Sequence, residues 1–155
     1  MNVRQAEKKD LEKICSQYDE MYRILRGFGF SYTINEETIG HILEVFIKSK
    51  LCCLAVAEQD DIIYGFVCAS IVKVDRMYDT GDEKQVGIIN DIYVDEQYRG
   101  KYVSQALLEY AEEWLKKSGI KSVRAEILTN NTPAFNFWFK EGYSPVYTGV
   151  SKDLN

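Results

Sequence analysis

The sequence predicts an α/β domain, residues 1–155, in which a mixed central sheet of about six to seven strands is flanked by helices on both faces. Three observations favour this fold class. Strand-like and helix-like segments alternate along the chain, a strand–helix–strand unit runs from about 88 to 128, and residues 51–74 have the pattern of a hairpin. The first unit requires parallel strands and the hairpin requires antiparallel ones, so the sheet must be mixed. The length of 155 residues fits a single domain with a substantial core.

The N-terminal part predicts a strand at 2–6 and then a helix from about 8 to 25. Apolar residues of that helix recur at three- and four-residue steps and form one face, namely Leu11, Ile14, Cys15, Tyr18, Met21, Tyr22 and Leu25. Residues 26–32 break the pattern with two glycines among aromatic residues. We consider two interpretations of this segment, a loop packed over the core and a mobile wall of a substrate pocket.

A second amphipathic helix is predicted to begin near Asn35, a residue that favours helix N-termini. Its apolar face comprises Ile39, Ile42, Leu43, Phe46 and Ile47. His41, the only histidine, lies off this face, and we interpret it as a solvated residue. A single histidine excludes multi-histidine metal sites, and no motif around a serine or cysteine supports a histidine-based triad. We therefore expect no metal.

A continuous apolar run at 51–57 is typical of a strand covered on both faces, and residues 62–74 supply the returning strand of the hairpin. The following loop, 75–84, carries four acids. These acids would either attract a cationic substrate or form a solvated hairpin tip. Residues 85–94 predict the next strand.

The C-terminal half contains the cleanest helical periodicity in the chain, ended by Gly119 and built on Val103, Ala106, Leu107, Tyr110, Ala111, Trp114 and Leu115. An alternating segment at 122–128 then predicts a strand. A polar cap at Asn130 and Pro133 near the first turn predict a short helix. Residues 143–147 and 150–154 predict two last short strands.

Composition restricts the function classes. The net charge of −5, without a basic stripe, argues against general nucleic-acid binding. We find no membrane-length apolar run and no signal peptide, so we expect a cytoplasmic protein without a membrane partner. The four cysteines lie in apolar segments without metal-ligand spacing, and we interpret Cys15, Cys52, Cys53 and Cys68 as reduced core residues.

The junction between the strand at 85–94 and the following helix has the features of a phosphate cradle. It carries Arg99, Gly100 and Lys101 in a short polar turn. The first N–H groups of a helix have no intrahelical partner, and the helix dipole adds partial positive charge there. Because Gly100 lets the backbone come close and two cations flank it, the turn is predicted to bind an anion.

Two short motifs resemble those of the Gcn5-related N-acetyltransferase (GNAT) superfamily. Residues 97–102 resemble the Gln/Arg-x-x-Gly-x-Gly/Ala signature through Gln97 and Gly100, with Tyr102 in place of the final small residue. The second motif, Asn-x-x-Ala-x-x-Phe/Leu-Tyr-x-Lys-x-Gly-Phe, is matched at Asn131, Ala134, Phe137, Lys140, Gly142 and Tyr143, with Trp138 at the tyrosine. Their order, with a helix and a strand between them, implies the acyl-CoA N-acyltransferase fold.

The resemblance implies a binding path for acetyl-CoA as co-substrate. The backbone of Ile92, Tyr93 and Val94 would hydrogen-bond the pantetheine arm, as in strand addition. The pyrophosphate would lie against Arg99, Gly100, Lys101, Tyr102, Val103 and Ser104. The other side of the coenzyme would be lined by Asn131, Phe135 and Trp138.

The implied reaction is direct attack of a primary amine, from a small molecule or a peptide, on the acetyl thioester. Asp91 is the candidate base, with a structural carboxylate and a partner for the substrate ammonium as its alternatives. Trp138 stands where the family often has a proton-donating tyrosine, so water or another tyrosine would protonate the thiolate. The candidate tyrosines are Tyr93, Tyr98, Tyr102, Tyr143 and Tyr147. The alternative function is an acetyl-CoA-binding sensor with little catalysis. The resemblance to this family also suggests a homodimer.

Overall fold

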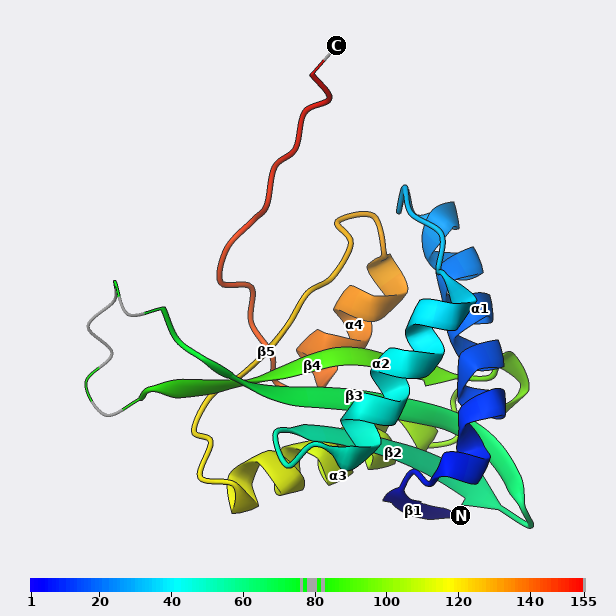
Figure 1. Ribbon diagram of the computed structural model, residues 1–155. Helices are drawn as coiled ribbons and strands as arrows, with labels where there is room; N and C mark the ends of the chain where they lie inside the picture. The colour runs from blue at the N-terminus through cyan, green and yellow to red at the C-terminus, as the bar shows by residue number, and fades with distance from the viewer. Residues whose placement is uncertain (76, 78–80, 82, 155) are drawn as a thin grey trace.

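A twisted sheet organises the described part of the chain in the computed structural model (Figure 1). The structure describes residues 1–75, 77, 81 and 83–154. Five strands lie in the order β1 (Asn2–Gln5), β2 (Cys52–Gln59), β3 (Ile62–Lys73), β4 (Gln85–Val94) and β5 (Val123–Ala125) within those residues. The pairs from β1 to β4 are antiparallel and the β4–β5 pair is parallel, so the predicted mixed sheet is confirmed.

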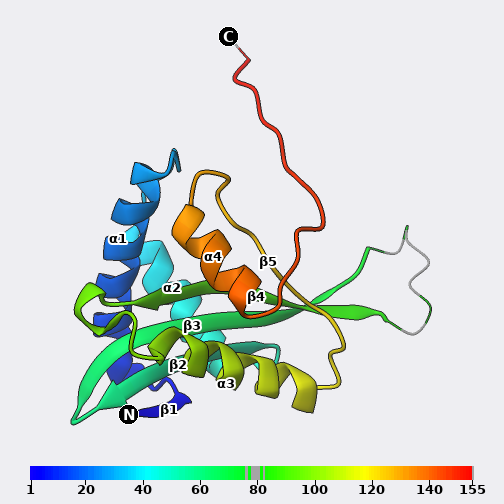
Figure 2. The same ribbon diagram turned by 180° about the vertical axis from the view of Figure 1, so that it is seen from behind.

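Helices cover both faces of the sheet, as predicted. They are α1 (Leu11–Gly27), α2 (Glu36–Lys48), α3 (Val103–Lys117) and α4 (Thr132–Lys140), with short 3₁₀ turns at Lys8–Asp10 and Glu96–Tyr98. Helices α1 and α2 lie on one face in Figure 1, and α3 and α4 lie on the other face, seen from behind in Figure 2. The two cores alternate along β2: Leu54 and Val56 pack under α1 and α2, whereas Cys53 and Ala55 pack under α3. This alternation explains the continuous apolar run of that strand.

The C-terminal segment corrects the predicted strand count. The expected strands at 143–147 and 150–154 do not form, so the described residues make five strands rather than six or seven. The segment instead leaves the body as an extended tail (Figure 1), with Val146, Val150 and Leu154 almost fully exposed. Pro145 lacks a backbone N–H, and β5 offers an edge of only three residues, so little is available for a strand to pair with.

Two other predicted segments differ from the structure. The strand expected at 122–128 is limited to β5, because residues 126–131 turn away toward α4. The acidic loop expected at 75–84 lies partly outside the described residues, at 76, 78–80 and 82. No helix in the described part of the chain has both the length and the apolar character needed to cross a membrane.

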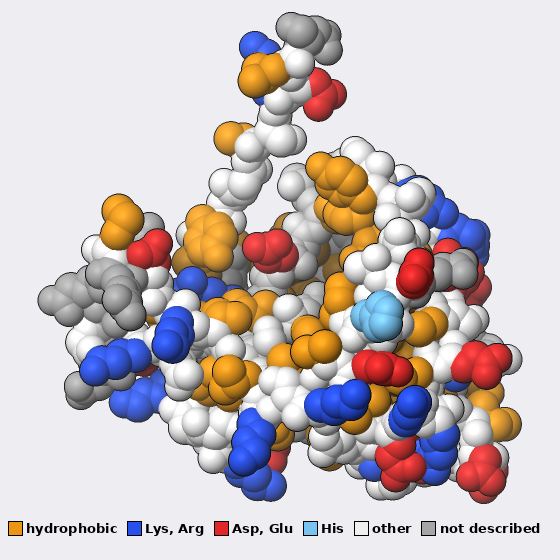
Figure 3. Space-filling view, in the orientation of Figure 1, with side chains coloured by type: hydrophobic (Ala, Val, Ile, Leu, Met, Phe, Trp, Pro, Cys, Tyr) orange, Lys and Arg blue, Asp and Glu red, His pale blue; other side chains and the backbone are white. Residues whose placement is uncertain are grey.

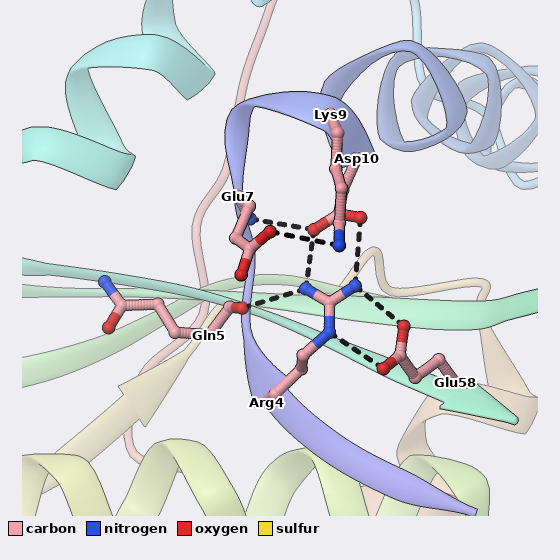
Figure 4. A network of polar contacts seen from close by, with 6 residues as sticks. All are labelled: Arg4, Gln5, Glu7, Lys9, Asp10 and Glu58. Atoms are coloured by element: carbon pink, nitrogen blue, oxygen red, sulfur yellow. Dashed lines mark hydrogen bonds and ion pairs between the residues drawn. The ribbon is translucent and has the colours of Figure 1, made fainter. Parts of the chain in front are cut away.

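A partly buried ion network ties the N-terminal strand to the rest of the fold (Figure 4). The Arg4 guanidinium donates to the carboxylates of Asp10, at 2.7 and 3.0 Å, and of Glu58, at 2.9 and 2.7 Å. Asp10 is buried and also accepts from the Glu7 N–H at 2.7 Å. Burial alone would raise the pKa of the Asp10 carboxyl, but the bonds from Arg4 and Glu7 outweigh it and hold that pKa below its usual value.

Arg4→Met should destabilise the protein by about 2 kcal/mol, because it leaves the buried Asp10 carboxylate without its cation. A lowered folded pKa means that the carboxylate stabilises the fold above its unfolded pKa and loses this effect as the pH falls through the folded pKa. The stability difference between wild type and variant should therefore shrink in acid. Urea denaturation at pH 7 and pH 3 measures this difference. Lys9→Met, which removes an exposed ion pair with Glu7, is the control and should leave the midpoint unchanged.

Candidate functional site

Strand β4 extends beyond the end of its neighbour β5, so part of its edge, the free edge, is unpaired on that side within the described residues. The two strands pair only at Gly87–Val123, Ile88–Arg124 and Ile89–Ala125. Beyond this point β4 continues to Val94, while the chain after β5 departs toward α4 (Figure 1). On this side, the last part of β4 therefore has no strand partner within the described residues.

A β-bulge at Asn90 decides which peptide groups face the free edge. The register with β3 shifts there, since Ile89 pairs with Ala69 and Asp91 with Cys68. Before the bulge, the Gly87 N–H donates toward β5, to the Ser122 carbonyl at 3.0 Å. An extra residue reverses the alternation of a strand.

After the bulge, the odd-numbered residues face β3. The Asp95 N–H donates to the Tyr64 carbonyl in that direction at 2.9 Å. The peptide groups of Ile92 and Val94 consequently point to the free edge, where the Val94 carbonyl accepts from Arg99 Nε at 3.0 Å. Tyr93 faces β3 through its backbone, so its peptide groups do not lie on the free edge.

The turn after β4 presents an open helix N-terminus. Gly100 and Tyr102 adopt positive φ angles of 72° and 65°, and Tyr102 precedes α3 without a side-chain cap. The first turn of α3 contains no acidic residue, whereas Arg99 and Lys101 lie immediately before it. Nothing lies within 4 Å of a Cβ built on Gly100, so space remains above this backbone. Such a turn favours an anion.

The bulk of Tyr102 does not close this turn. Its side chain is 55% exposed, and its hydroxyl donates to Glu109, about two helical turns further along α3. Val103 is buried and can offer a ligand only its backbone, while Ser104 donates its hydroxyl to Gln105. Arg99, Gly100, Lys101 and the exposed Tyr102 ring therefore form the surface of the turn, with the Tyr102 hydroxyl directed to Glu109.

Asp91 lies beside the free edge, on the face covered by α1. Its carboxylate accepts a hydrogen bond of 2.8 Å from the hydroxyl of Tyr18, whose ring is 2% exposed. Burial raises the pKa of Asp91, and the Tyr18 bond only partly opposes this rise. No lysine or arginine in the described part of the chain forms an ion pair with it. Asp91 is thus a largely desolvated carboxylate without a cation.

The residues of the second motif begin just before α4 at Asn131 and end just after it at Gly142 and Tyr143. The side chain of Asn131 caps α4 by accepting from the Ala134 N–H at 3.2 Å. Phe135 and Trp138 line a cavity of about 400 Å³ whose other walls are β5, residues 126–129 and the C-terminal segment. Figure 3 shows this face hollowed beside that segment, with hydrophobic side chains around the hollow. No residue of β4 or of the turn lines the cavity, so the proximity of these residues to a coenzyme stays a prediction.

Two of the tyrosines considered as proton donors are already engaged. The Tyr143 hydroxyl donates to Glu112 at 2.8 Å, and burial followed by this contact raises its pKa well above the usual value. Tyr102 is held by Glu109. Tyr98 stacks on Tyr64 with a centroid distance of 3.8 Å. Of the remaining two, Tyr93 is buried beside the Arg99 guanidinium, whereas Tyr147 is exposed on the tail.

The aromatic segment after α1 is fixed to that helix. The Phe30 N–H donates to the Leu25 carbonyl and the Gly29 N–H to the Arg26 carbonyl, with Gly29 at φ 96°. These are the two bonds of a Schellman motif. The Phe30 ring also contacts Tyr22 edge-on, with centroids 5.3 Å apart. Residues 26–32 are therefore fixed to α1 but mostly exposed, so they do not pack over the core. Their role as a wall of a substrate pocket stays a prediction.

This segment also approaches the chain that leaves β5. A Cβ built on Gly29 would lie 3.9 Å from Asn130 Nδ2, in the loop between β5 and α4. The end of α1 and the start of α4 therefore meet across the free edge of β4, and both views of the ribbon show them side by side (Figures 1 and 2). Neither this contact nor the hydrogen bond from Tyr18 to Asp91 was predicted, because each joins residues far apart in the sequence.

Comparison with known proteins identifies the family. The family model described as "Acetyltransferase (GNAT) family" matches residues 11–143. Streptothricin acetyltransferase of Escherichia coli is 30% identical over 89 residues, which are 57% of this chain and 50% of that protein, so the match spans half of the relative's length.

Solved structures of related fold agree with this match. A predicted acetyltransferase of Clostridium acetobutylicum, solved with acetyl-CoA, has a TM-score of 0.77 at 18% identity and covers 98% of this chain and 95% of its own. An aminoglycoside 6'-N-acetyltransferase of Acinetobacter haemolyticus has a TM-score of 0.79 at 18% identity, with full coverage of both chains. The chain thus belongs to the GNAT family of acetyltransferases.

Proposed function

We propose that the protein is an acetyl-CoA-dependent N-acetyltransferase that transfers the acetyl group to a primary amine. The observation that carries the proposal is the continuity of three features along one stretch of chain: the Asp91 carboxylate, the free edge at Ile92 and Val94, and the open turn into α3. An extended coenzyme on this path has its diphosphate at the turn and its thioester near Asp91. Relatives that act on streptothricin and aminoglycosides support an amine as acceptor.

The coenzyme is held by charge at one end and by backbone at the other. The diphosphate takes the uncapped N–H groups of α3 together with Arg99 and Lys101, which are charge-assisted partners. The amide groups of the pantetheine arm pair with the peptide groups of Ile92, in the manner of an added strand. The Val94 carbonyl contributes when Arg99 turns from it toward the diphosphate.

Asp91 accepts the proton of the attacking amine. An ammonium ion must lose a proton before its nitrogen can attack, and a carboxylate whose pKa is raised by burial is a better base than a solvated one. The nitrogen then forms a bond to the carbonyl carbon, the C–S bond breaks, and the thiolate takes up a proton while the nitrogen releases one. With a thiol pKa of about 8.5, the thiolate leaves without an obligatory acid, so Trp138 does not preclude turnover.

Tyr18→Phe should shift the acidic limb of the pH–rate profile to higher pH. The hydroxyl lowers the pKa of Asp91, so its removal raises that pKa further, and a base is lost as soon as the pH falls below its pKa. Rates from pH 5 to 9 with acetyl-CoA in excess measure the shift. If the rates fall at every pH and the acidic limb does not move, the role of Tyr18 is purely structural.

Calorimetric titration with acetyl-CoA, followed by thiol release in the presence of primary amines, tests the proposed function. We expect binding and amine-dependent release of free coenzyme thiol. Binding without thiol release for any amine would favour the sensor over the transferase. Absence of binding would remove the coenzyme path along β4.

A further inference from the structure

The aromatic rings of α1 and its following segment form a continuous series that starts beside Asp91. Tyr18, which bonds to Asp91, stacks on Phe66 with centroids 4.5 Å apart and lies 6.3 Å from Tyr22. Tyr22 contacts Phe30, which in turn contacts Tyr32 at 5.5 Å. The series therefore runs from the half-buried Asp91 carboxylate to the Tyr32 ring, which is 72% exposed.

The rings of Tyr22, Phe30 and Tyr32, here called the aromatic wall, are held in place by backbone and side-chain contacts. The Schellman motif fixes the backbone of Phe30, and the contact of Gly29 with Asn130 joins the segment to the loop before α4. Tyr22 and Phe30 remain partly exposed, so a ligand reaches their rings. A rigid aromatic surface binds apolar groups without a large ordering cost.

The charges near the wall suit one positive charge on the ligand, not several. Asp91 is the carboxylate at its inner end and forms no ion pair within the described residues. On the last turns of α1, Arg23 pairs with Glu20 and also lies near Asp19. Arg26 adds a further cation. These two carboxylates and two guanidinium groups balance one another, so the half-buried Asp91 carboxylate is the one left for a single positive charge on a ligand.

We propose that the acceptor is a primary amine with a single positive charge, carried on an aromatic or other apolar group. The amine faces Asp91, and the apolar group packs against Tyr22, Phe30 and Tyr32. This inference rests on the proposed transferase function and narrows it to a substrate class. It separates this chain from relatives named for acetylating the polar antibiotics streptothricin and aminoglycosides.

Initial rates of thiol release with three probes test this inference in the full-length protein: phenethylamine, ethylamine and spermidine. We expect kcat/KM for phenethylamine to exceed that for each of the others at least tenfold, since the ring buries apolar area that ethylamine lacks. Spermidine used as well as phenethylamine would overturn the inference and leave the transferase function standing. Failure of all three despite bound acetyl-CoA would overturn the function itself.

Variants of the wall provide the second measurement. Phe30→Ala should lower the ratio of kcat/KM for phenethylamine over ethylamine about tenfold, and Phe30→Leu, which keeps an apolar side chain of similar reach, should lower it less. Tyr110→Ala on α3, across the sheet, is the control for loss of a partly buried ring and should leave the ratio unchanged. An equal loss with both amines in Phe30→Ala would contradict the assignment of the wall.

Discussion

Gly100→Asp should weaken acetyl-CoA binding about a hundredfold or more. The residue has a φ of 72°, so any side chain strains the backbone by roughly 1–2 kcal/mol. The new carboxylate also stands beside the open N-terminus of α3, where it repels a diphosphate and competes for the same N–H groups. The loss of one or two charge-assisted hydrogen bonds, each about 1.5–3 kcal/mol, accounts for the expected factor. Isothermal titration with acetyl-CoA measures it.

Gly119→Asp is the matched control for this variant. Gly119 follows α3 with a φ of 80°, and nothing lies within 4 Å of a Cβ built there, so the same substitution meets the same backbone strain. It lies at the opposite end of the helix from the turn. Both variants should lose stability in thermal melts, Gly119→Asp more than Gly100→Asp because its carboxylate stands at the negative end of the helix dipole. Only Gly100→Asp should lose the coenzyme. Equal affinities in the two variants would end the assignment of the turn as the diphosphate site.

The strand, turn and helix that carry this site could be predicted from the sequence because each has a strong local pattern. Helix α3 begins at Val103, as its apolar stripe indicates, and Gly100 adopts the positive φ expected of a glycine in a tight turn. The bulge at Asn90 could not be predicted. The polar pair Asn90 and Asp91 interrupts the apolar run there, but such a pair fits exposed positions of a regular strand as well as an extra residue, so the pattern does not fix the register.

Long-range contacts account for the other differences. Tyr18 belongs to the apolar stripe of α1, and the sequence therefore indicates a core residue, although its hydroxyl bonds to a carboxylate 73 residues away. The last two predicted strands had suitable alternation, but a strand forms only where an edge is available to pair with it. Since β5 has three residues, the local pattern of the C-terminal segment was not sufficient.

Asp91→Asn should lower kcat by about a hundredfold or more at neutral pH while the affinity for acetyl-CoA stays within about threefold. The amide still accepts the Tyr18 hydrogen bond but cannot take the proton of the amine. Steady-state kinetics with separate kcat and KM values measure the effect. Asp95→Asn is a control on the same segment, since this carboxylate is engaged by Lys13 at 2.9 Å and Gln17 at 3.0 Å, and it should lose stability rather than turnover.

The stability of Asp91→Asn separates catalysis from folding. Burial raises the pKa of Asp91 in the folded state, so the protonated carboxyl stabilises the fold relative to the carboxylate. This contribution to stability is lost as the pH rises through the folded pKa. Asparagine stays neutral, so the variant should melt at a higher temperature than wild type at pH 7 and at a similar one in acid. A loss of turnover in a more stable protein cannot arise from unfolding.

The kinetic pattern of this variant also distinguishes the three roles considered for Asp91. A fall in kcat with little change in KM for the amine indicates a base, since the interaction is needed only in the transition state. A rise in KM with kcat unchanged indicates a partner for the substrate ammonium. Unchanged kinetics with altered stability indicates a structural carboxylate. Because Asp91 forms no ion pair in the described structure, the amine itself is the charge that would complete the site. We therefore expect a large fall in kcat accompanied by a smaller rise in the KM for the amine.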